Sequence, residues 1–364
     1  MKLVVQIRLM PDADQSTKLR ETVERSNEAC NWIAEVAFGR RTANVFELRK
    51  LAYHEVRAKF GLSSQQTQLA IKAVSDAYKR NKTIKVSFRP RASIAYDPRT
   101  MSFKGIDRVS LLTLEGRIVV PFILGKYQAD RISHAKGQCG LMLRGDGKWF
   151  LVVTVDVPED SPIPVTDFIG IDLGIAAIAA DSDGNQYSGK PIEKIRRKHN
   201  LQRKRLQKRN TKGAKKKLKR ISGKEARFRK HENHCISKSI VENAGGTNRG
   251  IGLEDLKGIR ARITARGGDA RNRLGGWAFS QLGVFIGYKA ALAGVPVVSI
   301  DPRNTSRTCS ECGHCARANR KSQGEFSCKA CGMSMNADQN AALNIKFKAL
   351  AAFKPAIELV SPRA

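Results

Sequence analysis

Residues 167–183 read DFIGIDLGIAAIAADSD, two runs of apolar, partly β-branched residues on either side of a short break. This pattern predicts a β-hairpin in which Gly170 and Gly174 bracket Asp172. A carboxylate in the middle of so apolar a strand is costly to bury unless it has a partner. Asp172 is therefore a candidate functional residue.

Two further segments place an acidic residue at a junction between elements. Residues 250–256 (GIGLEDL) predict a short apolar strand that ends in Glu254, and Asp338 falls in the first turn of a helix that runs through Ile345. Taken singly, Asp338 is explained as a helix cap, Glu254 as a helix-start charge and Asp172 as a turn residue. Taken together, three carboxylates at the junctions of an α/β segment suit a pair of Mg²⁺ ions that hydrolyses a phosphodiester.

Two CxxCG motifs lie between the second and third of these carboxylates. Their cysteines are Cys309, Cys312, Cys328 and Cys331. Four thiolates at this spacing are typical of a closed, structural zinc ribbon, whose metal would contribute roughly 10 to 16 kcal/mol to the folding of a segment with almost no core of its own. Cys315 is excluded because no glycine follows it, and His314 is interpreted as a surface histidine.

The charge of the chain points to a polyanionic partner. The 364 residues carry 66 Lys+Arg against 33 Asp+Glu, a net charge of +33, while 41% hydrophobic residues leave enough apolar surface for real cores. Such a surplus argues against an ordinary metabolic enzyme, in which nothing would offset the self-repulsion. More than half of it, +18, lies in residues 190–230.

The spacing of leucine and isoleucine in this basic stretch predicts two helices that form an antiparallel pair, with a break near residues 210–213. A solvated helical face or a disordered arm is the alternative. Almost no acidic residues neutralise the stretch, which favours binding to a phosphate backbone. The candidate phosphate ligands are Arg196, Arg197, Lys204, Arg205, Lys208, Arg209, Lys216 and Lys217.

The N-terminal half predicts a small barrel interrupted by helices. Residues 2–9 form a strand pattern, and residues 16–82 have helical periodicity sufficient for two to four helices. Short β-rich runs follow at IKVSF (84–88), RIVVPFIL (117–124) and WFLVVTVDV (149–157). The proline-containing tract at 159–165 marks a domain boundary.

The C-terminal half predicts a layered fold. A helix over residues 277–293 ends at Gly294, and VPVVSI (295–300) is predicted to be a buried strand. Together with the hairpin and the helix at Asp338, this order predicts an RNase H-like α/β fold. No stretch reaches the roughly 18 uncharged apolar residues of a membrane span, and the N-terminus lacks a signal-peptide pattern. We therefore expect a soluble, cytoplasmic, nucleoid-associated protein with no membrane partner.

Four segments together resemble the TnpB family, the transposon-encoded relatives of type V CRISPR effectors. They are GIDLGIAAIA, GLEDLKGI, YKAALAGVPVVSIDPRNTSRTCSECGH and FSCKACGMSMNADQNAALNI. These motifs lie within residues 168–345, and the N-terminal half matches the family only in layout. The family often has Asp where Asn336 stands and Arg where Leu343 stands, but neither position is one of the expected metal ligands.

The resemblance implies an RNA-guided DNA endonuclease. It makes Asp172, Glu254 and Asp338 the carboxylates of a RuvC nuclease site with two Mg²⁺ ions, and the four CxxCG cysteines the ligands of one structural Zn²⁺ in a target-nucleic-acid-binding insertion. The implied partners are a guide RNA transcribed from the transposon end, double-stranded target DNA with a short adjacent motif, and the displaced single strand. A monomer is expected.

The implied layout is multidomain, α/β plus β-barrel. It consists of a wedge β-barrel at 1–15 and 83–165, an inserted helical recognition domain at 16–82, a RuvC-like nuclease domain at 166–304 and 333–350 with a basic helical insertion at 190–245, a zinc ribbon at 305–332, and a tail at 351–364.

Two smaller groups of residues are weaker candidates for nucleic-acid contacts. Arg307 and Arg320 flank the first CxxCG motif and could steer or clamp a DNA strand, although a structural or solvated arginine explains them equally well. Three glutamines at the start of a predicted helix could read adenine edges in the adjacent motif, because glutamine pairs with adenine through two hydrogen bonds. They are Gln65, Gln66 and Gln68.

Three other functions compete with the nuclease. A nuclease-inactive, guide-directed DNA-binding repressor would have lost at least one carboxylate, yet all three are present. A nonenzymatic basic zinc protein of the ribosomal or RNA-chaperone type leaves the three carboxylates unexplained. A guide-independent accessory role in transposition is the remaining alternative.

Overall fold

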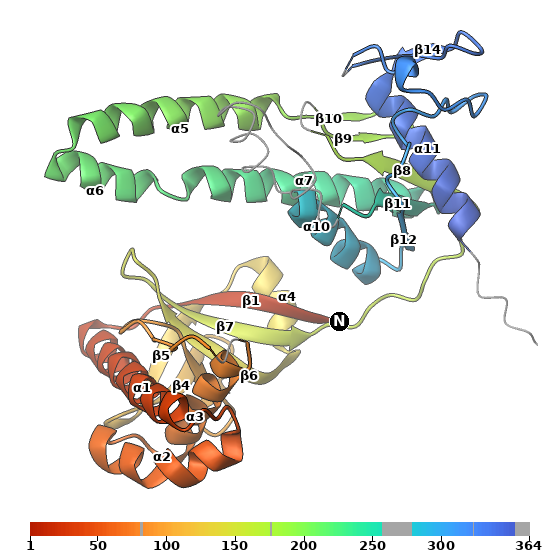
Figure 1. Cartoon of the computed structure of the whole chain (residues 1–364). Coiled ribbons are helices and arrows are strands. Elements are labelled where there is room, and N and C mark those ends of the chain that lie inside the picture. The colour runs from red at the N-terminus through yellow and green to blue at the C-terminus, as the bar shows by residue number, and fades with distance from the viewer. Residues whose placement is uncertain (81–82, 175–176, 257–278, 323, 354–364) are drawn as a thin grey trace, which may run out of the picture. The chain divides into compact units, whose positions relative to one another are not determined.

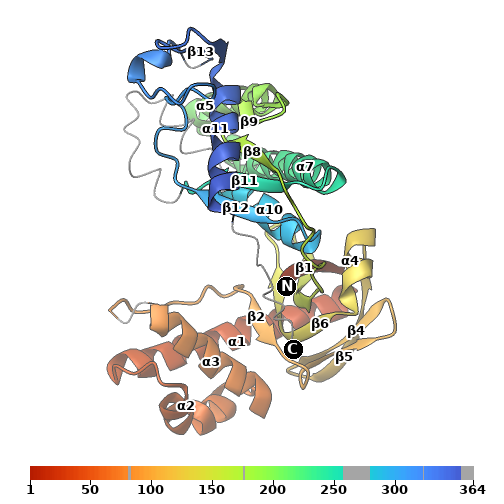
Figure 2. The same cartoon turned by 90° about the vertical axis from the view of Figure 1, so that its right-hand side faces the viewer.

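A computed structural model describes residues 1–80, 83–174, 177–256, 279–322 and 324–353 (Figures 1 and 2). The chain divides into two compact units, Met1–Pro158 and Glu159–Ala364. None of the described helices combines the length and the apolarity that a bilayer crossing requires.

The first unit contains a seven-stranded antiparallel sheet. Its order is β2 (Ile94–Tyr96), β6 (Ala135–Leu143), β7 (Trp149–Asp156), β1 (Lys2–Leu9), β5 (Gly116–Ile123), β4 (Arg108–Thr113) and β3 (Met101–Lys104). Strand β1 alternates exposed and buried residues, so that Val5, Ile7 and Leu9 point inward. Inward-facing residues of all seven strands meet in one core, so the sheet is a near-barrel. The N-terminal strand thus joins strands that follow it by about a hundred residues, as the sequence predicted.

Three long helices separate β1 from the rest of this sheet: α1 (Ala13–Gly39), α2 (Val45–Phe60) and α3 (Ser64–Arg80). Asp12 and Gln15 form a capping box at the start of α1, and Gly61, with φ +66°, ends α2. A short helix, α4 (Lys126–Ile132), follows β5. The prediction of two to four helices is confirmed, since three occur between Ala13 and Arg80.

The predicted strand at residues 84–88 is wrong. Within the described part of the chain, this segment pairs with no strand. Its backbone bonds the Asn31 side chain of α1 instead: Phe88 N–H donates to Asn31 Oδ1 at 2.7 Å, and Asn31 Nδ2 donates to Phe88 O at 2.9 Å. Val86 and Phe88 pack against the core of the three helices. The alternating pattern therefore reflects packing on helices rather than pairing in a sheet.

The second unit is built on a five-stranded sheet. Its order is β10 (Gln186–Ser188), β9 (Ala177–Asp181), β8 (Phe168–Asp172), β11 (Gly250–Glu254) and β12 (Val297–Ile300). Strands β8, β11 and β12 are parallel, and β9 pairs antiparallel with both β8 and β10. The hairpin predicted at 167–183 is confirmed as β8–β9. Strand β12 is not buried as predicted, because it lies at the sheet edge, where Val297 is 37% exposed.

Helices cover both faces of this sheet. Helices α7 (Lys224–Gly246) and α10 (Phe279–Leu292) pack against the face that carries Ile169, Ile171 and Ile251. Helix α11 (Ala337–Ala352) packs against the opposite face, with Phe168. Strand residues alternate between faces, so Gly170 and Asp172 lie on the α11 face.

The basic stretch forms three helices rather than two. Helix α5 (Lys190–Arg209) ends at Asn210, whose φ of +45° is left-handed, at the predicted break. The chain returns alongside α5 as α6 (Lys212–Ile221) and then α7 (Figure 1). Gly223, with φ +77°, separates α6 from α7. The antiparallel arrangement was predicted, but the break at this glycine was not.

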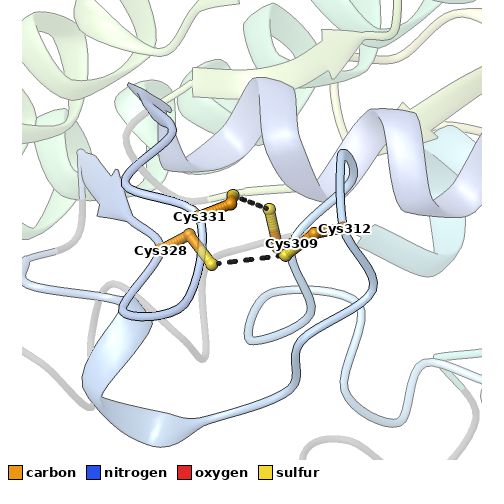
Figure 3. Close-up of side chains that lie close together, drawn as sticks. All are labelled: Cys309, Cys312, Cys328 and Cys331. Atoms are coloured by element: carbon orange, nitrogen blue, oxygen red, sulfur yellow. Dashed lines mark hydrogen bonds between the residues drawn. The ribbon is translucent and has the colours of Figure 1, made fainter.

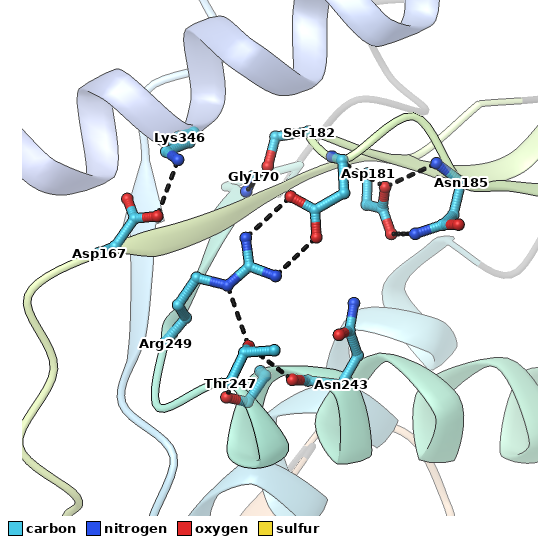
Figure 4. A network of polar contacts seen from close by, with 11 residues as sticks. Asp167, Gly170, Asp181, Ser182, Asn185, Asn243, Thr247, Arg249 and Lys346 are labelled. Carbon is cyan, nitrogen blue, oxygen red and sulfur yellow. Dashed lines mark hydrogen bonds and ion pairs between the residues drawn. The ribbon is translucent and has the colours of Figure 1, made fainter.

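An ion pair fastens the turn after β9 to the start of β11. Arg249 Nη1 and Nη2 donate to the two oxygens of Asp183 at 2.8 and 2.6 Å. Arg249 Nε donates to Thr247 Oγ1 at 3.0 Å (Figure 4). The hydrogen bonds from Arg249 lower the pKa of Asp183 below its usual range. The pair is partly screened by water, because 32% of the Asp183 side chain is exposed.

Replacing Arg249 by methionine is expected to lower the free energy of unfolding at pH 7 by about 1–2 kcal/mol. Because the folded pKa of Asp183 is depressed, this contribution is present above the unfolded pKa of about 4 and disappears as the pH falls through the lower folded value. Urea titrations at pH 7 and pH 3 measure both parts. Lys238→Met, which removes an exposed pair with Glu242, serves as the control and should change stability by less than about 0.5 kcal/mol. A pH-independent loss in Arg249→Met would contradict the expectation.

Candidate active site and zinc ribbon

Two of the predicted carboxylates lie side by side at the ends of adjacent strands. Ile171 of β8 pairs with Leu253 of β11 in parallel register. The next residues, Asp172 and Glu254, therefore meet at the carboxyl ends of both strands. In parallel α/β sheets, this is where ligands bind.

Two glycines let α11 lie directly on these strands. A Cβ atom at Gly170 would fall 2.0 Å from Ala342 O, and one at Gly252 would fall 2.8 Å from Ala349 Cβ. Helix α11 begins at Asn336, whose Oδ1 accepts from Asp338 N–H at 2.9 Å. The close approach brings Asp338, in the first turn, to the acidic strand ends. Asn336 caps the helix, so the departure from the family pattern there leaves the helix start intact.

Replacing Gly170 by alanine is expected to displace α11, because the clash is with helix backbone rather than with a flexible side chain. Overpacking of this kind costs about 1–3 kcal/mol or more, and Asp338 would move with the helix. We expect a lower melting temperature, measured by differential scanning calorimetry. Gly213→Ala is the matched control, because a Cβ atom there meets no atom within 4 Å. A wild-type melting temperature in Gly170→Ala would show that the close contact is dispensable.

Burial raises the pKa of all three carboxylates above their usual range. Burial, followed by repulsion from Glu254 and Asp338, raises the pKa of Asp172 to about 7. Burial also raises the pKa of Glu254 and of Asp338. Hard carboxylate oxygens that repel one another in a buried place are the donors that Mg²⁺ prefers, so these residues fit that ion.

A threonine that the sequence did not single out orients one of the carboxylates. Thr305 Oγ1 donates to Glu254 Oε1 at 2.6 Å. Thr305 O in turn accepts from Asn344 Nδ2 of α11 at 2.9 Å. Thr305 belongs to the DPRNTSRTCSECG run that carries the family resemblance, and this was the available signal.

The four predicted cysteines converge. The Sγ atoms of Cys309 and Cys331 are 3.7 Å apart, those of Cys312 and Cys328 are 3.6 Å apart, and all four lie within 4.8 Å of one another (Figure 3). Hydrogen bonds, first from the Cys331 backbone, lower the pKa of Cys328 to about 6, which favours the thiolate that binds zinc. Among the described residues, this is the one group of three or more Cys, His, Asp or Glu with ligand atoms so close. The predicted cysteine cluster is therefore confirmed. The carboxylate oxygens of Asp172, Glu254 and Asp338 do not all lie within 4.8 Å of one another.

Buried amides hold the cysteine loops together and attach them to α11. Asn319 Nδ2 donates to Arg307 O and to His314 O, each at 3.0 Å, and Lys329 N–H donates to Asn319 Oδ1 at 3.0 Å. Asn340 Nδ2 of α11 donates to the backbone before Cys309. His314 is half-buried beside this core rather than on the surface as predicted.

Comparisons with known proteins place the chain in a family. A Cas12f1-like TNB domain model matches residues 279–345, and a probable transposase model matches residues 150–257. The chain is 30% identical over 315 residues to the CRISPR-associated endodeoxyribonuclease Cas12f1 of Sulfoacidibacillus thermotolerans, covering 80% of this chain and 71% of that relative. The chain belongs to the TnpB family, which is related to Cas12f.

Two further relatives of this TnpB-family chain match over shorter stretches, and one solved structure matches over nearly its whole length. The putative RNA-guided DNA endonuclease InsQ of Escherichia coli is 28% identical over 220 residues, 55% of this chain and 53% of InsQ. The chain likewise spans 50% of Cas12f1 from Syntrophomonas palmitatica. The mini-RNA-guided endonuclease CRISPR-Cas_phi3 has the same fold, with a TM-score of 0.60 at 11% identity over 96% of this chain and 92% of that one.

The predicted phosphate ligands of this TnpB-family protein fall into two groups. Arg196 is buried and donates to Glu193 at 2.7 and 2.8 Å, and its role as a phosphate ligand stays a prediction. Arg197 is exposed but also bonds Glu193, at 2.8 Å. The remaining six are exposed and form no ion pair with another described residue. They are Lys204, Arg205, Lys208, Arg209, Lys216 and Lys217.

The three glutamines of the TnpB-family chain differ in accessibility. Gln66 is buried, its Nε2 donates to Leu112 O at 3.3 Å, and its Oε1 accepts from Ser63 N–H at 3.0 Å. Reading a base edge would break both hydrogen bonds, which makes Gln66 the least accessible of the three glutamines, and its role stays a prediction. Gln65 and Gln68 are partly exposed and make side-chain hydrogen bonds.

Of the two candidate arginines near the first CxxCG motif, Arg320 lies beside the carboxylates. Arg320 Nη2 is 3.9 Å from Asp338 Oδ1, whereas Arg307 is exposed. The Arg320 charge opposes the rise in the pKa of Asp338 and Asp172.

Proposed function

We propose that this protein is an RNA-guided DNA endonuclease with a RuvC-type site formed by Asp172, Glu254 and Asp338. The observation that carries the proposal is the meeting of Asp172 and Glu254 at the ends of parallel β8 and β11, under the first turn of α11. The name of the relative that is 30% identical, a CRISPR-associated endodeoxyribonuclease, supports the same reaction class.

The chain's residues would hold two Mg²⁺ ions and keep their ligands oriented. Bound at these carboxylates, the metal pair supplies an activated water and stabilises the leaving oxygen. The charges of Glu254 and Asp338 both act on Asp172, because each raises its pKa. Thr305 restrains Glu254, and α11 restrains Thr305 through Asn344. The geometry of the ligand set thus depends on the attachment of α11.

The proposed layout follows the family. Near-barrel strands and helices α1–α3 form the wedge and recognition domains, the five-stranded sheet forms the RuvC domain, and the cysteine cluster binds one structural Zn²⁺ in the target-loading insertion. The proposed partners are a guide RNA, target DNA with a short adjacent motif, and the displaced strand, with the protein a monomer. Gln65 and Gln68 remain proposed readers of the motif.

The basic helices offer a defined path for a phosphate backbone. A groove of about 400 Å³ lies between α5 and α6. It is lined by Lys198, Leu201, Gln202, Arg205, Leu206, Arg209 and Lys217. Two leucines and four cationic side chains line this groove, and the lysines and arginines could bind the phosphates of a nucleic-acid strand. The protein would hold the guide duplex here by its backbone rather than by its sequence.

Neutralising four exposed cations of α5 is expected to weaken RNA binding and to flatten its salt dependence. The variant replaces four residues by glutamine: Lys204, Arg205, Lys208 and Arg209. The negative slope of log K against log[salt] should become smaller in magnitude by up to about 3, since each phosphate contact contributes roughly 0.7–0.9. Fluorescence anisotropy between 50 and 200 mM salt measures the slope. Arg203→Gln is the control, because Arg203 is already paired with Glu225. An unchanged slope would place the RNA elsewhere.

The proposed function is tested by the nucleic acid that the protein carries. The protein is purified from cells that carry its gene together with the DNA that flanks it in the genome, and the RNA bound to the protein is sequenced. We expect one discrete RNA that directs binding to a DNA bearing its complement and a fixed flank selected from a randomised library. A heterogeneous RNA pool without directed DNA binding would favour a nonenzymatic basic zinc protein.

A further inference from the structure

Arg320 is a positive charge that the structure places beside Asp338 of the acidic site, and Lys348 acts on Glu254. Its Nη2 atom is 3.9 Å from Asp338 Oδ1, an ion pair too long for a hydrogen bond, and 31% of its side chain is exposed. Its charge acts on Asp172 as well as on Asp338. Arg317, three residues earlier, is exposed and forms no ion pair with another described residue.

The position of Arg320 is set by the same strands that lead into α11. Arg320 forms an isolated antiparallel bridge with Phe326, a fully buried residue of β13 (Glu325–Ser327). Strand β13 pairs with β14 (Ser334–Asn336), and β14 ends at the residue that caps α11. Ala337 N–H also donates to Gly324 O at 3.2 Å. Arg320 and Asp338 are therefore held by one small hairpin.

The cysteine cluster stabilises this hairpin. Cys328 directly follows β13, and its N–H donates to Met333 O at 2.8 Å, just before β14. Phe326, Cys309 and Cys328 share one small core. A zinc ion on the four thiolates would fix the hairpin and with it the distance from Arg320 to the carboxylates.

We propose that Arg320 is a built-in counter-ion of the acidic site, which competes with divalent cations for the carboxylates while the protein holds no DNA. The inference rests on the proposed function, because it requires that the three carboxylates bind such cations. A fixed cation near 4 Å from a ligand repels an incoming metal ion and takes part of the charge that would bind it. A DNA phosphate offers the guanidinium a better, bidentate partner. Strand entry would therefore release the carboxylates, so that metal affinity rises when substrate arrives.

The test measures metal binding without cleavage. Zinc-loaded, DNA-free protein is titrated with Mn²⁺ at pH 8, and free Mn²⁺ is followed by electron paramagnetic resonance. Arg320→Gln is expected to bind Mn²⁺ about three- to tenfold more tightly than wild type, whereas Arg320→Lys and the control Arg317→Gln should bind as wild type does. Zinc content confirms that the cysteine loops stay folded in each variant. Equal or weaker binding in zinc-replete Arg320→Gln would overturn the inference.

Asp172→Asn distinguishes the failure of the inference from the failure of the proposed function. If wild type and Asp172→Asn bind Mn²⁺ alike, the carboxylates are not a metal site and both proposals fail. If Asp172→Asn loses a binding site while Arg320→Gln matches wild type, the counter-ion role alone fails. A short single-stranded DNA added to wild type should tighten Mn²⁺ binding and should have less effect in Arg320→Gln. The same tightening in both would also count against the inference.

Discussion

Asp172→Asn is expected to lower guide-dependent DNA cleavage by at least about 10³-fold, equivalent to about 4 kcal/mol of transition-state stabilisation. The substitution removes an anionic ligand from the centre of the acidic site, where Asp172 interacts with both Glu254 and Asp338. Single-turnover cleavage of a matched plasmid measures the loss. Target binding should be unchanged, because the residue lies in the proposed cutting site rather than on the basic helices.

The same substitution is expected to stabilise the zinc-loaded protein when no Mg²⁺ is bound at the carboxylates. The folded pKa of Asp172 is raised from 3.8 to about 7, so the folded state holds its proton more tightly than the unfolded state does. Stability is therefore lost as the pH rises between about 4 and 7, and asparagine avoids that loss. We expect a gain of roughly 1–3 kcal/mol at pH 8 in zinc-loaded protein without added Mg²⁺, reversed by Mg²⁺, which stabilises only wild type. An active Asp172→Asn protein, or one less stable than wild type without added Mg²⁺, would contradict the assignment.

Cys309→Ser is expected to abolish zinc binding and to unfold the cysteine loops. Among the residues that the structure describes, the core beneath them consists of Cys309, Phe326, Cys328, Ala337 and the partly buried Met333. Metal binding at such a site supplies roughly 10 to 16 kcal/mol, more than so small a core provides. Zinc analysis and limited proteolysis between residues 305 and 332 measure the effect. Cleavage should fall too, because Asn340 and Asn344 attach these loops to α11.

Cys315→Ser is the matched control for this experiment. Cys315 is exposed and lies outside the convergent cluster. The variant should keep one zinc ion per chain and resist proteolysis as wild type does. Loss of zinc in Cys315→Ser, or its retention in Cys309→Ser, would show that the ligand set is different.

Local patterns in the sequence were sufficient to predict the strands and the helix that carry the candidate carboxylates, and the cysteine cluster. Apolar strands ending in Asp172 and Glu254 and a helix starting near Asp338 follow from periodicity, and the CxxCG spacing predicts the thiolate cluster. The need for glycine at 170 and 252 did not follow from periodicity, because it arises from the contact with a helix more than 80 residues away in sequence.

The differences between the sequence predictions and the structure have a common physical cause. Residues 84–88 alternate like a strand, but the Asn31 amide satisfies their backbone. Arg196 was selected for its positive charge in the basic stretch, but it is buried and pairs with Glu193, which lies one helical turn earlier. In each case a tertiary or side-chain partner outweighs the local pattern. Thr305 was missed for the same reason, since its role depends on how the chain returns to Glu254.

The most direct test compares cleavage of two plasmids that differ only in their complementarity to the co-purified RNA. Each is incubated with the wild-type complex in Mg²⁺, in EDTA, and with Asp172→Asn, Glu254→Gln and Asp338→Asn in Mg²⁺. We predict that only the matched plasmid is cut, only by wild type and only with Mg²⁺. Cutting of the mismatched plasmid at a similar rate, or cutting of the matched one by all three carboxylate variants, would contradict the account.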